Sequence, residues 1–97
     1  MYTHTIKVPT VTLSEDEDGN PVEHVEYNVK TFVLKSFGLM PGSVSKDHLG
    51  DAEGQMWAAF EWGLSRAQFD DLGVVPLAEL EKMLRAWQAD AGLEPGE

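Results

Sequence analysis

The stretch VEYNVKTFVL, residues 25–34, decides the first half of the fold. Apolar, aromatic and β-branched residues recur at every second position and share one face: Val25, Tyr27, Val29, Thr31 and Val33. This period-two alternation indicates a β-strand. Phe32 and Leu34 are apolar on the opposite face, so we expect another part of the chain to cover the strand near Phe32.

A second strand is predicted upstream, where Ile6, Val8, Val11 and Leu13 lead into the acidic stretch SEDEDGNP, residues 14–21. The end of that stretch is typical of a turn, because Gly19 and Asn20 tolerate positive φ and Pro21 cannot continue a ladder. We therefore predict an antiparallel β-hairpin over residues 4–13 and 22–35. Pro9 confines the first strand to an edge or a break.

The residues after the hairpin predict a connector and then helices. Gly38, Pro41 and Gly42 punctuate the connector, where Ser43 or Ser45 can cap a short helical turn through His48. The apolar period then becomes helical over residues 52–64, with Asp51 as the N-cap. SRAQ, residues 65–68, matches a capping box in which Ser65 is the N-cap and Gln68 reaches back to it. Gly73 is expected to end this short helix.

The last predicted helix has the strongest local signals. Pro76 suits the first turn and Gly92 suits the residue after the C-cap. Its apolar stripe consists of Leu77, Leu80, Met83, Leu84 and Trp87. We assign Leu80 and Leu84 to the core, and Met83 and Trp87 to a face that contacts a partner.

These elements define a single α+β domain, with an N-terminal antiparallel β-hairpin followed by three to four short α-helices. Its expected parts are the hairpin region at 1–37, a connector at 38–50, a helical region at 51–92 and a flexible tail at 93–97.

Composition restricts the class of partner. Acidic residues outnumber basic ones 17 to 7, and the net charge of −10 repels nucleic-acid phosphates. Cysteine is absent, which excludes disulfides and thiolate chemistry and fits a cytosolic protein. No signal peptide or membrane-spanning run is visible. We expect neither nucleic acid nor a membrane as a partner.

No motif predicts an enzyme, a cofactor site or a metal site. A calcium loop beginning at Asp16 would place Pro21 where the turn glycine is needed. His4, His24 and His48 lack the spacing of metal ligands. Nucleophile motifs and phosphate loops are also absent.

Large side chains in the helical half are the candidate binding residues. Tryptophan and methionine are frequent at protein interfaces, and a small core has limited room for three indoles. The helical periodicity does not decide whether the three tryptophans belong to the core or to a face that contacts a partner. The predicted partner-binding residues are Trp57, Trp62, Met83 and Trp87.

The region from Met40 to Glu97 resembles the short tail assembly chaperones of long-tailed phages that infect actinobacteria. MPGSV (residues 40–44), VPLAELEKMLRAWQADAG (residues 75–92) and PGE (residues 95–97) carry the resemblance. It implies a protein that binds the apolar, helix-rich tape measure protein in the host cytoplasm and keeps it soluble during tail tube assembly.

The resemblance further implies a longer form made by programmed ribosomal frameshifting, with PGE at the frameshift region. The sequence leaves open a homo-oligomer or a hetero-oligomer with that longer form. Two other functions remain open: a structural tail or head–tail component retained in the virion, and an acidic DNA mimic.

Overall fold

The computed structural model describes residues 1–92 and has an α+β fold, which confirms the predicted fold class. An antiparallel hairpin of β1 (Tyr2–Glu15) and β2 (Pro21–Leu34) is followed by α1 (Ala52–Gly63), α2 (Arg66–Asp71) and α3 (Leu77–Asp90). Short 3-10 turns join these elements at Phe37–Leu39, Gly42–Val44, Lys46–His48 and Leu72–Val74. The tail expected at 93–97 lies outside the described residues.

The hairpin pairs Tyr2 with Leu34 at its base and Glu15 with Pro21 at its tip. Asp16 organises the turn, because its side-chain Oδ1 accepts the backbone N–H of Asp18 at 2.9 Å and of Asn20 at 2.8 Å. Gly19 takes a φ of 78°, the left-handed conformation that a glycine adopts without steric cost. Both strands are longer at the turn than the sequence predicted.

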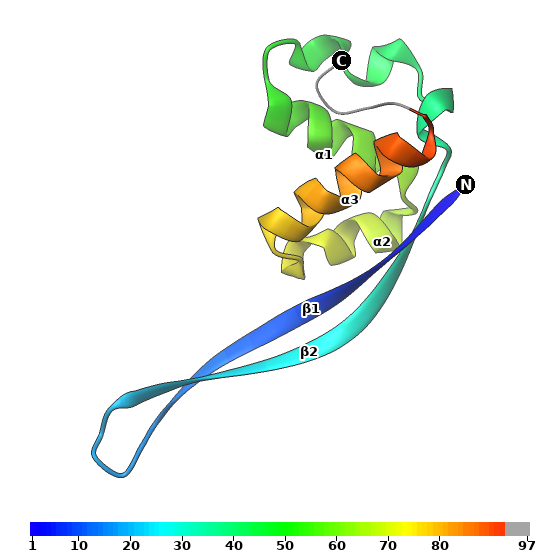
Figure 1. Cartoon of the computed structure of the whole chain (residues 1–97). Helices are drawn as coiled ribbons and strands as arrows, with labels where there is room; N and C mark the ends of the chain where they lie inside the picture. Colours follow the sequence, from blue (N-terminus) through cyan, green and yellow to red (C-terminus); the bar gives the residue numbers. More distant parts are fainter. Residues whose placement is uncertain (93–97) are drawn as a thin grey trace.

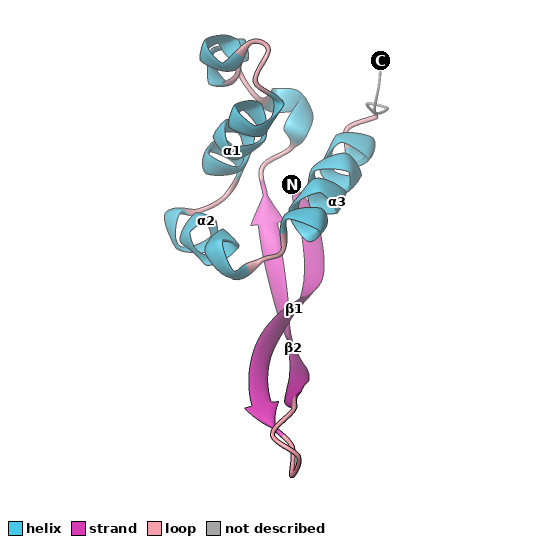
Figure 2. Ribbon diagram, turned by 90° about the vertical axis from the view of Figure 1, so that its left-hand side faces the viewer, coloured by secondary structure: helices cyan, strands magenta, loops and turns pink. Residues whose placement is uncertain are grey.

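Only the base of the hairpin is packed against helices (Figures 1 and 2). The side chains that it buries are Ile6, Val8, Phe32 and Leu34. The rest of the ribbon projects from the helices, and the molecule measures 56 × 27 × 25 Å. Its radius of gyration of 16.7 Å exceeds the value of about 13 Å expected for a compact chain of this length. The predicted cover at Phe32 is therefore present, whereas no part of residues 1–92 covers the distal hairpin.

Two predicted helix caps are confirmed. Asp51 Oδ1 accepts the N–H of Gly54 at 3.0 Å, and Ser65 Oγ accepts the N–H of Gln68 at 3.3 Å. Gly92, with a φ of 81°, follows the C-cap of α3 as expected. Pro76 occupies the N-cap position of α3, directly before the first turn.

Three local predictions are wrong. No serine side chain caps the 3-10 turns of the connector. Gly73 does not end α2, because the chain continues into the 3-10 turn Leu72–Val74 and Gly73 does not take a positive φ. Gln68 does not complete a capping box, because its side-chain amide bonds to β2: Nε2 donates to Thr31 O at 3.1 Å, and Oε1 accepts from Val33 N at 3.0 Å.

The core is centred on Trp87. Its indole stacks on Phe60 with ring centroids 5.9 Å apart and meets Phe37 edge-on at 4.9 Å. The indole Nε1–H donates to the carbonyl oxygen of Lys35 at 2.7 Å, which satisfies a polar group that would be costly to bury alone. Since Lys35 N also donates to Gly63 O at 2.9 Å, the end of β2 is bonded to both α1 and α3.

Candidate partner-binding groove

The structure corrects the expectation for Met83 and Trp87. Both side chains are 0 % exposed and belong to the core, so neither presents a face to a partner. Leu80 is buried as predicted, whereas Leu84 is only partly buried. The sequence-based prediction is therefore wrong at three positions of α3: Met83 and Trp87 belong to the core, and Leu84 lies on the accessible side.

Trp57 and Trp62 are partly buried and lie in two separate surroundings. Trp57 meets Phe69 of α2 edge-on, with ring centroids 6.3 Å apart. Trp62 lines a hollow with Val44 and His48, and the ammonium group of Lys35 lies 4.9 Å from the centroid of its ring. The four predicted binding residues consequently do not form one surface.

An apolar groove instead runs between α1 and α3. It consists of two hollows of about 290 and 310 Å³ that share Ala52, Met56 and Leu84 as lining residues. Phe37, Met40 and Ala59 extend the first hollow, and Leu77 extends the second. We call these seven residues and the space between them the α1–α3 groove.

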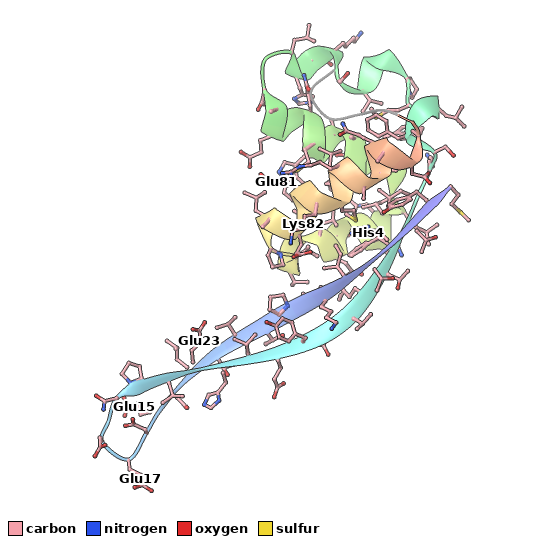
Figure 3. The ribbon with its side chains drawn as sticks, viewed as in Figure 1. His4, Glu15, Glu17, Glu23, Glu81 and Lys82 are labelled. Atoms are coloured by element: carbon pink, nitrogen blue, oxygen red, sulfur yellow. The ribbon has the colours of Figure 1, made fainter. Side chains whose placement is uncertain are left out.

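The groove has a polar and acidic border. Gln55 and Gln88 line the first hollow, and Glu53 and Glu81 line the second. Figure 3 shows Glu81 on the exposed part of α3. An apolar floor with an acidic end suits an apolar helix that carries basic residues at its flank.

A sequence signal for this groove was present in the spacing. Ala52, Met56 and Ala59 follow the i, i+4, i+7 row of one helix, and Leu77 and Leu84 follow the i, i+7 row of the other. Side chains spaced in this way lie on one line along a helix. What the spacing did not reveal is that these two rows face each other at the surface.

A broader hollow of about 560 Å³ lies at the hairpin base, lined by Val33, Leu34, Leu39 and Leu64. It is more open than the α1–α3 groove, and Lys35, Ser36 and Ser65 also border it. The α1–α3 groove is the better match to a helical ligand because a row of apolar side chains from each of two helices lines it.

Titratable groups with shifted pKa values lie at the hairpin base, outside the groove. Burial lowers the pKa of His4, and the Glu79 carboxylate opposes this effect. Burial, followed by the charge of Asp90, raises the pKa of the Tyr2 hydroxyl. Tyr2 Oη and His4 Nδ1 are hydrogen-bonded at 2.8 Å. Within residues 1–92, no three His, Asp or Glu side chains converge in a way that could hold a metal ion.

Comparisons with protein-family models, curated proteins and solved structures found no match to this chain. None of the helices between residues 1 and 92 is long and apolar enough to cross a membrane.

Proposed function

We propose that the protein is a phage tail assembly chaperone, which binds apolar helical segments of the tape measure protein in the host cytoplasm. Two observations support the proposal: the resemblance over residues 40–97, and the α1–α3 groove. The groove carries it, because an accessible apolar groove between two helices is what an amphipathic helix needs for binding.

The mode of binding follows from the groove. The apolar face of a tape measure helix packs on Met56, Leu77 and Leu84, and its basic residues lie near Glu53 and Glu81. The groove gives contact without covalent chemistry, so the complex can dissociate when the tail tube assembles. The net charge of −10 keeps the loaded complex soluble.

Coexpression with the tape measure protein of the same phage tests the proposal. We expect the two proteins to co-elute in size exclusion, and the tape measure protein to be more soluble than when expressed alone. Separate elution together with unchanged solubility would refute the proposed function.

A structural tail component retained in the virion is the second candidate. The projecting hairpin favours it, because subunits of rings and tubes use such arms to reach their neighbours. Mass spectrometry of purified virions separates the two functions, since a chaperone leaves before the particle is complete. Stoichiometric amounts in the virion support the structural component.

A further inference from the structure

The distal hairpin is a β-ribbon with one apolar face, although both of its faces are exposed. We call the odd-numbered side chains of this part the outer face. Its apolar members are Pro9, Val11, Leu13, Val25, Tyr27 and Val29, and Glu23, opposite Leu13, is a charged member among them. The even-numbered positions of the same segment are mostly polar: Thr10, Thr12, Ser14, His24, Glu26 and Asn28. A ribbon surrounded only by water has no need of this alternation, which normally marks a face that is covered.

The exposure of the outer face is large. Leu13 is 73 % exposed, Val29 65 % and Tyr27 64 %. With Val11 and Val25, these five residues expose about 500 Å², most of it apolar, which lies in the range of the largest patches that monomers display. Two copies packed through this face would bury at most about 1,000 Å² in total from these residues, at the lower limit of specific interfaces.

The outer face carries three charged side chains in the ladder, Lys7, Glu15 and Glu23, and of these Lys7 and Glu15 are self-complementary. Val11 lies midway between Lys7, on the side of the helices, and Glu15, at the tip. Figure 3 places Glu15 and Glu23 together with Glu17 at the far end of the ribbon. If two ribbons stack in opposite directions about Val11, Lys7 of each copy lies over Glu15 of the other. Stacking in the same direction would bring the two acidic tips together, which is electrostatically unfavourable.

The edges of the hairpin are less suited to pairing than its outer face. At the base of the hairpin, the free edge of β2 is already hydrogen-bonded to Gln68, through the carbonyl oxygen of Thr31 and the N–H of Val33. In an antiparallel ladder these outward-pointing groups alternate along each strand, so the backbone N–H and C=O groups at the odd positions of β1 also point away from the partner strand. Pro9 occupies one of them, and it has no N–H to offer a further strand.

From this geometry we infer that the chain forms a twofold homodimer, in which the outer faces of two hairpins stack in opposite directions about Val11. An isolated two-stranded ribbon is only marginally stable in water, and a second copy gives the distal hairpin the cover that the helices do not reach. The α1–α3 groove is not part of this interface, so dimer formation and tape measure binding are separable.

Sedimentation equilibrium of the purified full chain tests the dimer. We expect a monomer–dimer equilibrium with a dissociation constant in the micromolar range, since the interface is small. Val11→Asp should weaken the dimer at least about tenfold, because a carboxylate would be buried at the centre of the stack. Thr12→Asp, one residue away on the other face, should change it less than about twofold. A chain that stays monomeric at all concentrations, or equal effects of the two variants, overturns the inference.

Charge exchange tests the direction of stacking. Lys7→Glu should weaken the dimer severalfold, and Lys7→Glu combined with Glu15→Lys should restore it. A double variant as weak as Lys7→Glu alone would overturn the antiparallel arrangement. Circular dichroism of each variant confirms that the helices remain folded.

Crosslinking gives a second readout that does not depend on affinity. The chain has no cysteine, so Val11→Cys introduces a unique thiol. Face-to-face sheets stand about 10 Å apart, and a short bifunctional maleimide can span that distance. Covalent dimer from Val11→Cys but not from Thr12→Cys supports the inference, and the reverse result refutes it.

Discussion

The indole of Trp87 occupies the space that a side chain at residue 63 would require. A Cβ atom built on Gly63 would lie 2.6 Å from Cη2 and 2.7 Å from Cζ2 of Trp87, closer than such atoms approach in proteins. Because Trp87 is fully buried and its Nε1–H is bonded to Lys35 O, the ring cannot move aside without losing that bond. The close approach of α1 and α3 therefore depends on a glycine at the end of α1.

Gly63→Ala is expected to destabilise the protein by about 1–3 kcal/mol, because overpacking outweighs the better helix propensity of alanine. Urea denaturation followed by circular dichroism measures the change. Gly73→Ala is the matched control, since nothing lies within 4 Å of a Cβ there and its φ is not positive. If the two variants are equally stable, the packing of Trp87 against residue 63 is not as described.

Gln68→Glu is expected to lower stability near neutral pH by about 1–2 kcal/mol, because the carboxylate can accept from Val33 N but cannot donate to Thr31 O. The deficit relative to the wild type should shrink as the pH falls toward the ordinary glutamate pKa of about 4.3, since a protonated carboxyl group can donate. Thermal denaturation of both proteins at a series of pH values provides the test. A variant as stable as the wild type at neutral pH would show that the amide bonds to β2 contribute nothing.

The pH dependence of stability should contain a contribution from His4. Burial lowers its pKa below the ordinary value of 6.5, so the unfolded chain binds more protons than the folded chain at mildly acidic pH. The contribution is complete above about pH 6.5 and is lost as the pH falls through the folded-state pKa. His4→Gln should therefore lose less stability than the wild type between about pH 7.5 and pH 5.5.

Chemical denaturation at the two pH values measures this difference. His24→Gln, on the exposed part of the same hairpin, controls for removal of a histidine as such. An identical loss in His4→Gln and the wild type would contradict the role of His4.

The fold could be predicted from the sequence where the evidence is local. The alternation around Tyr27, the turn at Gly19 and the caps at Asp51 and Ser65 each depend on neighbouring residues, and each is confirmed. The role of Gln68 was missed because its partners on β2 are 35 and 37 residues away, and the nearby Ser65 offered a plausible local motif.

The candidate site was less predictable because helix periodicity defines an apolar arc without ordering the residues in it. Met83 and Leu84 lie about 100° apart in that arc, with Leu80 and Trp87 between them, and the elements packed against α3 decide which end of the arc is buried. The space left by Gly63 draws Trp87 inward, and Leu84 is then left at the groove. The sequence contained Gly63, but nothing local connected it to a residue on another helix.

The affinity of groove variants for the tape measure protein tests the central claim most directly. Leu77 lines the α1–α3 groove and is 53 % exposed, whereas the adjacent Ala78 is exposed outside it, so aspartate can be introduced at either position without opening the core. Titration calorimetry with a soluble tape measure segment should show a loss of affinity of about tenfold or more for Leu77→Asp and of less than about twofold for Ala78→Asp. Wild-type affinity in Leu77→Asp, or equal losses in both variants, would contradict binding through the groove.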